Sequence, residues 1–456
     1  MARALFGTDG IRGVAGEPPL DRRTAQAVGR ALGNWVHASG QPHSNVVFGN
    51  VVIGMDTRES GSWLASAVAA GLASAGVRAD FAGVTTTPGI AYLAKNGPFA
   101  AGVMISASHN PYQDNGIKLI GHGGYKFPDD SEEQLEAGIF RALEQNLEIP
   151  PVDLAVNPGL DRVYIDHLAS TLPGGLHGLT IVADCANGSA SMLAPELFQR
   201  LGARVHAIHC SPDGRNINLN CGSLHLESLR AATLQHAADV GVAFDGDADR
   251  ALFVARSGKI VDGDAVLFLT ARYLLERGEL SAGAQPPTVV ATVMSNLGLE
   301  KALRARGIAM VRTPVGDKYV LEEMLRRGAV LGGEQSGHVI FHRYATTGDG
   351  MLTALRVFEA MRHSRAGLDE LTDEIQVLPQ RLVNVRIKER KPLEDLPGVA
   401  AEIRAAEDSF GDSGRVLVRF SGTEPLARVM VEGPDLDRVE AFAQRIASRI
   451  RAELGG

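Results

Sequence analysis

Three aspartates stand at alternate positions in the segment DGDADR, at Asp245, Asp247 and Asp249. The apolar run VGVAF directly before them is typical of a buried strand, and α/β proteins bind ligands at the carboxyl ends of such strands. Carboxylates packed together repel one another unless a cation offsets their charge. Three carboxylates without histidine or cysteine suit Mg²⁺, which keeps positions for water or a phosphate oxygen. The segment therefore predicts a magnesium site.

Two other interpretations of DGDADR compete with the magnesium site. An EF-hand calcium loop also begins DxDxD, but it needs glycine at its sixth position and glutamate at its twelfth. Arg250 and Arg256 stand at those positions, which excludes such a loop. The other interpretation is a solvated acidic turn, which we disfavour because the aspartates directly follow a buried strand.

The hexapeptide SASHNP, at 106–111, follows the apolar run FAAGVMI and places Ser108 near the end of another strand. Ser108 could be a hydrolytic nucleophile, but the GxSxG elbow is absent, and neighbouring side chains such as those of Ser108 and His109 are expected to point in different directions. Ser108 or Asn110 could instead simply cap a turn. The third role is a phosphate carrier, for which DGDADR could supply the cation.

The segment FSGTEPLAR, at 420–428, predicts a turn between two strands. Ser421, Gly422 and Thr423 offer backbone N–H groups and hydroxyls there, and Arg419 and Arg428 add positive charge. The pattern favours an anion-binding loop, and a tight turn with incidental arginines is the alternative.

The segment GEQSGH, at 333–338, is another polar loop after an apolar run. Glu334 can accept, and Ser336 can donate, hydrogen bonds to the vicinal hydroxyls of a sugar. The loop is therefore a candidate for binding a sugar.

Composition limits the class of protein. The chain has 456 residues and a net charge of −8 without a basic block, so we expect no nucleic-acid partner. No apolar run is long enough to span a bilayer, and the N-terminal residues lack a signal peptide's apolar core, so we expect a cytoplasmic protein without a membrane partner. The cysteines Cys185, Cys210 and Cys221 are too irregularly spaced for a disulfide framework or a CxxC metal site, and we expect three reduced, buried thiols.

The order of apolar runs and turns predicts the domain organisation. Three successive regions alternate β-rich runs with helix-like segments, which predicts mixed, mostly parallel sheets in three similar α/β domains. The last region combines strand-like runs, two of them joined by a tight turn, with helix-like segments. This pattern predicts an α+β domain with an antiparallel sheet. The predicted domains are 1–158 with the SASHNP loop, 159–257 with DGDADR, 258–375 with GEQSGH, and 376–456 with the anion loop.

Six motifs in this order resemble those of the α-D-phosphohexomutase superfamily, and within it the phosphoglucosamine mutases of bacteria. They cover almost the full chain and are FGTDGIRG (6–13), SASHNP, DNGIK (114–118), DGDADR, GEQSGH and RFSGTEP (419–425). Members that act on glucose or mannose phosphates commonly show TASHNP or TGSHNP and GEMSGH. SASHNP together with Gln335 favours the glucosamine branch.

The resemblance implies four domains around a central cleft, and an enzyme that interconverts glucosamine 6-phosphate and glucosamine 1-phosphate. It implies that Ser108 is a phosphoserine, with Mg²⁺ between it and the three aspartates, and that glucosamine 1,6-bisphosphate is the intermediate. Arg12, Lys118 and Arg250 are the expected cations of the transfer, and His109, Lys118 and His338 are the candidates for the general acid or base. The expected substrate-binding residues are Glu334, Ser336, His338, Gly316, Arg419, Ser421, Gly422, Thr423 and Arg428.

Three alternatives stay open in the sequence. The first is a phosphoglucomutase or phosphomannomutase, since sugar choice rests on few hydrogen bonds. The second is a catalytically silent phosphosugar-binding protein, and the third is a metal-dependent phosphatase. The sequence leaves the oligomeric state open between monomer and homodimer.

The phosphate carrier gives the first testable prediction. Phosphopeptide mass spectrometry of the purified protein, treated with a hexose 1,6-bisphosphate, should find phosphate on Ser108. Ser108→Ala should lose both this phosphate and phosphoryl transfer between sugar oxygens, whereas Ser106→Ala should keep the phosphate on Ser108. A Ser108→Ala protein that still hydrolyses phosphosugars at the original rate would instead indicate a phosphatase.

Overall fold

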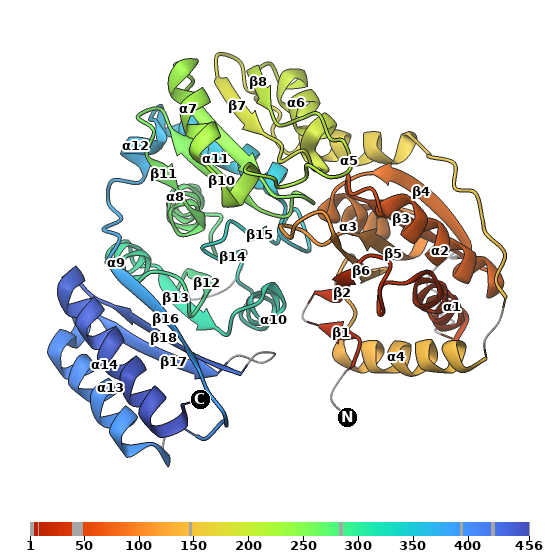
Figure 1. Ribbon diagram of the computed structural model, residues 1–456. Helices are drawn as coiled ribbons and strands as arrows, with labels where there is room; N and C mark the ends of the chain where they lie inside the picture. The colour runs from red at the N-terminus through yellow and green to blue at the C-terminus, as the bar shows by residue number, and fades with distance from the viewer. Residues whose placement is uncertain are drawn as a thin grey trace. The chain divides into compact units, whose positions relative to one another are not determined.

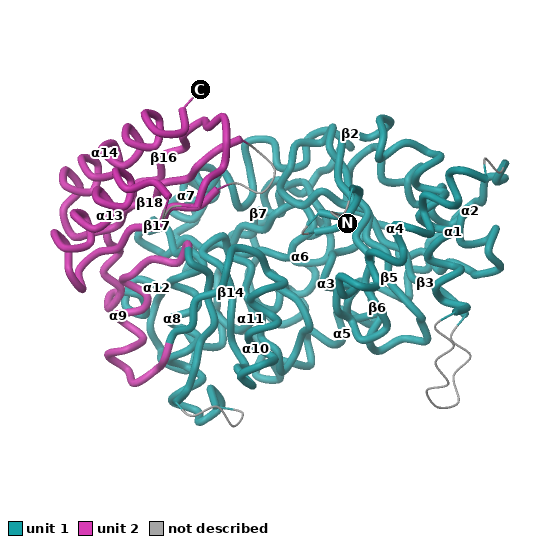
Figure 2. Tube along the Cα trace, turned by 90° about the horizontal axis from the view of Figure 1, so that it is seen from below, with its two compact units in different colours: residues 1–293, 310–372 teal, residues 294–309, 373–456 magenta. Residues whose placement is uncertain are grey.

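A computed structural model describes residues 4–7, 9–38, 49–145, 148–281, 286–392, 395–420 and 425–455. The chain divides into two compact units (Figure 2). Unit 1 comprises residues 1–293 and 310–372, and unit 2 comprises residues 294–309 and 373–456. Within the described ranges, no helix combines the length and the apolar character that crossing a bilayer would require.

The first sheet of unit 1 has six strands in the order β1-β2-β6-β5-β3-β4. Strands β5, β3 and β4 are parallel, and β6, β2 and β1 add antiparallel neighbours. Val51 and Ile53 of β3 pack with helices α1, α2 and α4, whereas Val52 packs with α3, because alternate residues of a strand face opposite sides. The elements are β1 Phe6–Gly7, β2 Gly10–Val14, α1 Arg22–Ala38, β3 Asn50–Met55, α2 Gly61–Ser74, β4 Arg78–Val84, α3 Thr87–Asn96, β5 Phe99–Ile105, β6 Asp114–Gly121 and α4 Asp129–Glu144.

The second sheet has the order β11-β10-β9-β7-β8, with β8, β7 and β9 parallel and β10 and β11 antiparallel. All five residues of β9 are buried, which explains its unbroken apolar run. Strand β11 lies beyond the boundary predicted at residue 257 and still pairs with β10. The elements are α5 Gly159–Ser170, β7 Thr180–Asp184, α6 Ala190–Arg200, β8 Arg204–Ile208, α7 Glu227–Gln235, β9 Val240–Phe244, β10 Ala251–Ala255 and β11 Ile260–Val261.

The third sheet has the order β13-β12-β14-β15, in which β12 and β14 are parallel and β15 is antiparallel to β14. Helix α10 packs on this sheet through Val320 and Met324. The elements are α8 Gly263–Glu276, β12 Thr288–Thr292, β13 Ala309–Thr313, α10 Asp317–Arg327, β14 Leu331–Gly333, β15 Val339–Phe341, α11 Gly350–Ser364 and α12 Leu368–Leu371.

Unit 2 holds an antiparallel sheet in the order β16-β18-β17, and helices α13 and α14 lie beside it (Figure 1). The buried core contains Val429 and Val431 of β18 together with Val439 and Ile446 of α14. The elements are α9 Leu297–Ala305, β16 Gln380–Arg386, α13 Pro397–Phe410, β17 Arg415–Phe420, β18 Leu426–Glu432 and α14 Leu436–Leu454. The predicted fold class, three α/β regions with mixed sheets followed by an α+β region, is confirmed.

The antiparallel strands explain where the motif loops lie. Residues 106–113 join β5 to β6, residues 245–250 join β9 to β10, and residues 334–338 join β14 to β15. Each joined pair is antiparallel, because a connection this short cannot hold the crossover helix that parallel neighbours require. The motifs SASHNP, DGDADR and GEQSGH are therefore hairpin connections, held at both ends by strands.

Candidate active site

Ser108 lies in the connection after β5 and is almost fully buried. Its backbone is in the left-handed region, with φ 53°, and its Oγ donates a 2.6 Å hydrogen bond to Asp245 Oδ2. The same Oγ lies 3.3 Å from His109 Nδ1. The expectation that the side chains of Ser108 and His109 diverge is therefore wrong, because the left-handed backbone at Ser108 turns them toward each other.

The three aspartates of DGDADR come together at the end of β9. Each offers a carboxylate oxygen within 4.8 Å of the others, and all three side chains are buried. Asp247 Oδ1 and Asp249 Oδ1 are buried and accept no hydrogen bond within the described part of the chain. Burial and the neighbouring aspartates raise the pKa of Asp245 and of Asp249. Oxygens that accept no hydrogen bond, together with mutual repulsion, fit a divalent cation bound among these carboxylates.

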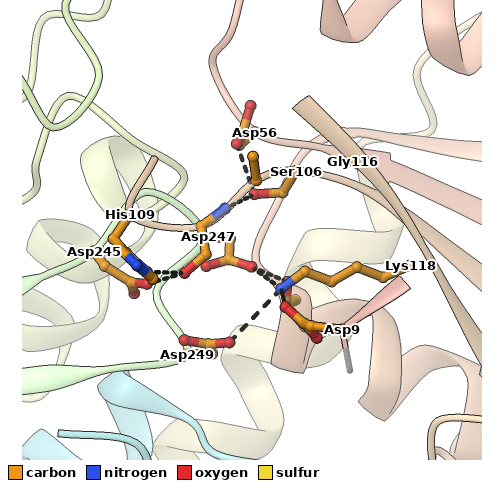
Figure 3. A network of polar contacts seen from close by, with 12 residues as sticks. Asp9, Asp56, Ser106, His109, Gly116, Lys118, Asp245, Asp247 and Asp249 are labelled. Atoms are coloured by element: carbon orange, nitrogen blue, oxygen red, sulfur yellow. Dashed lines mark hydrogen bonds and ion pairs between the residues drawn. The ribbon is translucent and has the colours of Figure 1, made fainter. Parts of the chain in front are cut away.

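Lys118 brings positive charge to the aspartates from β6 (Figure 3). Its buried Nζ lies 2.8 Å from Asp247 Oδ2 and 3.0 Å from Asp9 Oδ2. Burial alone would lower the pKa of Lys118, but Asp247, Asp9 and Asp249 hold it well above its ordinary value. Burial alone would raise the pKa of Asp247, but Lys118 and Thr87 hold it below its ordinary value. Lys118 is therefore a fixed cation in this geometry.

Two arginines and a histidine complete the surroundings of Ser108. Arg12 donates to the Ala107 carbonyl at 3.4 Å and pairs with Asp9. Arg250 Nε lies 3.8 Å from Asp249 Oδ1. Burial, together with Arg250 and Arg12, lowers the pKa of His109 to about 4, so that its imidazole is neutral at pH 7.

The GEQSGH loop lies after β14, and two of its candidate residues, Glu334 and His338, contact residues 316 and 317. Glu334 Oε1 accepts a 3.1 Å hydrogen bond from the Gly316 backbone N–H, and His338 Nε2 lies 3.7 Å from Asp317 Oδ2. The Ser336 Oγ is buried and makes no hydrogen bond within the described residues.

The Gln335 side chain turns away from this group, because its Nε2 donates to Asp262 Oδ2 at 3.1 Å. Asp262 caps α8 by accepting from the Ala265 N–H. Gln335 thus holds the loop against α8.

The predicted anion loop can be described only in part. Ser421, Gly422 and Thr423 lie outside the described residues. Arg419 and Arg428 are directly opposite each other on β17 and β18. Burial and the neighbouring Arg428 lower the pKa of Arg419.

Arg58 is a residue of the site that the sequence interpretation did not include. Its fully buried guanidinium donates to the carbonyls of Ser108 at 2.9 Å, Asn110 at 2.8 Å and Asp114 at 2.9 Å, and also to that of Pro111. One side chain thus holds most of the loop that carries Ser108. The segment DTR, at 56–58, is the sequence signal that could have identified Arg58. Charged side chains at the end of a buried strand need hydrogen-bond or ion-pair partners.

Asp56 and Ser106 link Arg58 to the Ser108 backbone. Asp56 Oδ2 accepts from Arg58 Nε at 2.8 Å and from Ser106 Oγ at 2.7 Å. Ser106 Oγ in turn accepts from the Ser108 N–H at 2.9 Å, which assigns Ser106 to the support of the loop (Figure 3). From the second sheet region, Asn218 Nδ2 donates to the carbonyl oxygens of Ser108 and Asn110.

Comparisons with known proteins agree with this arrangement. Models of domains I, II, III and IV of phosphoglucomutase/phosphomannomutase match residues 3–146, 162–258, 262–378 and 382–449. The chain belongs to this family of phosphohexomutases, and the predicted resemblance is confirmed.

The similar proteins include two phosphoglucosamine mutases. That of Solibacter usitatus is 60% identical over 100% of both chains, and that of Koribacter versatilis is 49% identical over 99% of this chain and 98% of the other. A solved phosphoglucomutase/phosphomannomutase family protein from Burkholderia thailandensis is 25% identical, with a TM-score of 0.77 over 98% of this chain and 97% of that one.

The contacts of Arg58 predict a positioning effect on turnover. Lysine at this site can satisfy only some of the carbonyls, so the loop would shift, and Arg58→Lys should lower kcat by about 10- to 100-fold with little change in the sugar KM. Steady-state kinetics on the folded variant measure this split. Arg200→Lys changes an exposed ion pair in the same way and should leave kcat unaltered. A folded Arg58→Lys protein with unaltered kcat would contradict the assignment.

The raised pKa values of Asp245 and Asp249 predict how metal binding depends on pH. A cation needs the charged carboxylates, so lowering the pH through these raised pKa values weakens Mg²⁺ binding, and raising the pH strengthens it. We expect up to about a tenfold loss of affinity per pH unit for each proton displaced. Calorimetric titration of Mg²⁺ at a series of pH values would show this, and an affinity that stays constant until ordinary aspartates titrate would refute it.

Proposed function

We propose that the protein is a phosphoglucosamine mutase, which interconverts glucosamine 6-phosphate and glucosamine 1-phosphate. The observation that carries this proposal is the hydrogen bond from Ser108 Oγ to a carboxylate of the three-aspartate cluster, with Lys118 beside them. The name of the two similar curated proteins supports glucosamine as the sugar. The product is suited to reactions that build amino-sugar nucleotides and cell-wall precursors.

The reaction begins from a phosphoserine at Ser108. The O1 hydroxyl of glucosamine 6-phosphate attacks the phosphorus, its proton leaves to a base, and the bond from phosphorus to Ser108 Oγ breaks. The products are glucosamine 1,6-bisphosphate and unphosphorylated Ser108. The bisphosphate then reorients in the site. Ser108 Oγ gives its proton to the base and attacks the phosphorus at O6, the bond from that phosphorus to O6 breaks, and O6 takes up a proton as glucosamine 1-phosphate leaves. Phosphoryl transfer of this kind depends mainly on positioning and on neutralising oxygen charges.

Asp245, Asp247 and Asp249 would hold the magnesium ion, together with an oxygen of the Ser108 phosphate. Bound there, Mg²⁺ would neutralise the charge that develops on the transferring oxygens. Lys118, Arg12 and Arg250 supply the remaining positive charge, and their contacts to aspartates and to a loop carbonyl keep them in place.

His109, Lys118 and His338 are the candidates for the general acid or base, and their contacts favour His109. His109 is neutral at pH 7 and lies 3.3 Å from Ser108 Oγ, so it can take the proton of that hydroxyl and return it. Lys118 is surrounded by carboxylates that keep it charged, which suits it to electrostatic stabilisation. His338 lies near Asp317 in the loop proposed to bind the sugar.

The remaining loops would bind the substrate. Glu334, Ser336, His338 and Gly316 would contact the sugar, and Arg419 and Arg428, with Ser421, Gly422 and Thr423, would hold the phosphate that is not transferred. The division into domains 1–158, 159–257, 258–375 and 376–456 gives each domain one of the four loops. We also propose a cytoplasmic enzyme, monomeric or homodimeric, that has no nucleic-acid or membrane partner.

Turnover of three sugars tests the proposed substrate. Glucosamine 6-phosphate, glucose 6-phosphate and mannose 6-phosphate should be compared at equal enzyme, Mg²⁺ and activating bisphosphate concentrations. We expect kcat/KM to be at least about tenfold higher for glucosamine 6-phosphate, since one hydrogen bond to the distinguishing amino group is worth roughly that factor. A preference for mannose 6-phosphate would assign the protein to another branch of the family. Ser108→Ala is the control for contaminating mutase and should show no turnover.

A further inference from the structure

A second group of metal-binding side chains lies in the region of the second sheet. Asp184, His209 and Cys221 each offer a ligand atom, and these three atoms lie within 4.8 Å of one another. Asp184 is the last residue of β7, and His209 directly follows β8. The group therefore lies at the same edge of the sheet as the three aspartates after β9, but next to the parallel strands β7 and β8.

Hydrogen bonds already orient the carboxylate of this group. Asp184 Oδ1 accepts from the Ala186 N–H at 2.9 Å, and Oδ2 accepts from the Gly222 N–H at 3.1 Å. The second bond fixes the chain next to Cys221 against the end of β7. Carboxylates that ligate metals are commonly held by such additional hydrogen bonds.

The His209 imidazole is the part of the group that solvent can reach. His209 Nδ1 lies 3.0 Å from Asp184 Oδ2, and the His209 side chain is 31% exposed, whereas Asp184 and Cys221 are buried. Solvent can thus reach the group from the side of His209.

We propose that Asp184, His209 and Cys221 form a second metal site, which takes a thiophilic divalent cation of the zinc type with water as its fourth ligand. An oxygen, a nitrogen and a sulfur ligand are a donor set that zinc accepts and Mg²⁺ does not. Tetrahedral zinc needs ligand atoms about 3.5 Å apart, so the widest separation has to contract by no more than about 1.3 Å.

Charge also favours a divalent cation in this partly buried position. As the cation binds, the Cys221 thiol releases its proton to solvent and the sulfur forms a bond to the metal. The carboxylate of Asp184 and the thiolate then carry two negative charges. His209 ligates through Nδ1 as a neutral imidazole, and the proton on Nδ1 passes to solvent or, from an already neutral ring, moves to Nε2. A divalent cation balances these charges, which lowers the cost of burying them.

The competing interpretation is an ion pair between His209 and Asp184 with an unreactive thiol nearby. The sequence predicts three reduced, buried thiols without metal-binding spacing; Cys185 and Cys221 are buried, whereas Cys210 is only partly buried. Two parallel strands and the segment before Gly222 bring the ligands together from distant positions. This inference is independent of the proposed function, because it uses none of the residues assigned to the mutase reaction.

Cobalt binding distinguishes the two interpretations. A Co²⁺ ion bound by a thiolate absorbs by sulfur-to-metal charge transfer, which the oxygen ligands of the three-aspartate cluster cannot produce. The protein, reduced with a phosphine, should develop this absorption as Co²⁺ is added, and Zn²⁺ should abolish it. Metal analysis after Co²⁺ loading should find one ion per chain more in the unaltered protein than in Cys221→Ser.

Matched variants identify the ligands. Cys221→Ser should lose the absorption and one bound Co²⁺ per chain, while its circular dichroism shows that it is folded. His209→Asn, chosen because asparagine tolerates the left-handed backbone of φ 47° at this position, should weaken binding at the thiolate site by at least about tenfold. Cys210→Ser is the control thiol and should keep the absorption. No absorption in the unaltered protein, or its survival in folded Cys221→Ser, would overturn the proposal.

Discussion

The site depends on keeping three buried carboxylates charged and close together. Two like charges about 4 Å apart repel by about 4 kcal/mol at the effective dielectric of a protein. One carboxylate oxygen of each of Asp245, Asp247 and Asp249 lies within 4.8 Å of the others, so cations have to be supplied from elsewhere in the fold. Lys118 supplies one of them from β6, a strand of a different sheet. The attraction between Lys118 and the aspartates therefore does two things. It holds the first two sheet regions together, and it supplies positive charge to the site.

Short connections between antiparallel strands hold the charged residues of the site close together. SASHNP, DGDADR and GEQSGH each join a strand to an antiparallel neighbour, so both ends of each loop are fixed by a sheet. Such loops can carry strained residues, and both Ser108 and Ala248 have a left-handed backbone. A phosphate carrier needs this rigidity, because phosphoryl transfer depends on the position of the reacting oxygen more than on its reactivity.

Buried polar groups stabilise the loop that carries Ser108. The guanidinium of Arg58 and the amide of Asn218 bind the same two carbonyls, those of Ser108 and Asn110, from two different sheet regions. Buried carbonyls would be costly without donors, so these contacts stabilise the fold and fix the loop at the same time. The proposed site at Asp184, His209 and Cys221 is built on the same plan, with a hydrogen-bonded carboxylate at a strand end.

Residue types and their order along the chain were enough to predict the three α/β regions, the α+β region and the cluster of DGDADR. Each is a local property: an apolar run, a turn, or carboxylates two residues apart. Contacts between distant residues were not predictable in this way. The pairing of Lys118 with Asp247, the Arg58 contacts, the approach of His109 to Ser108 Oγ, and the meeting of Asp184, His209 and Cys221 depend on backbone torsions and on which strands become neighbours. Only the assembled sheets decide these, because strand ends far apart in sequence share an edge only after the strands have paired.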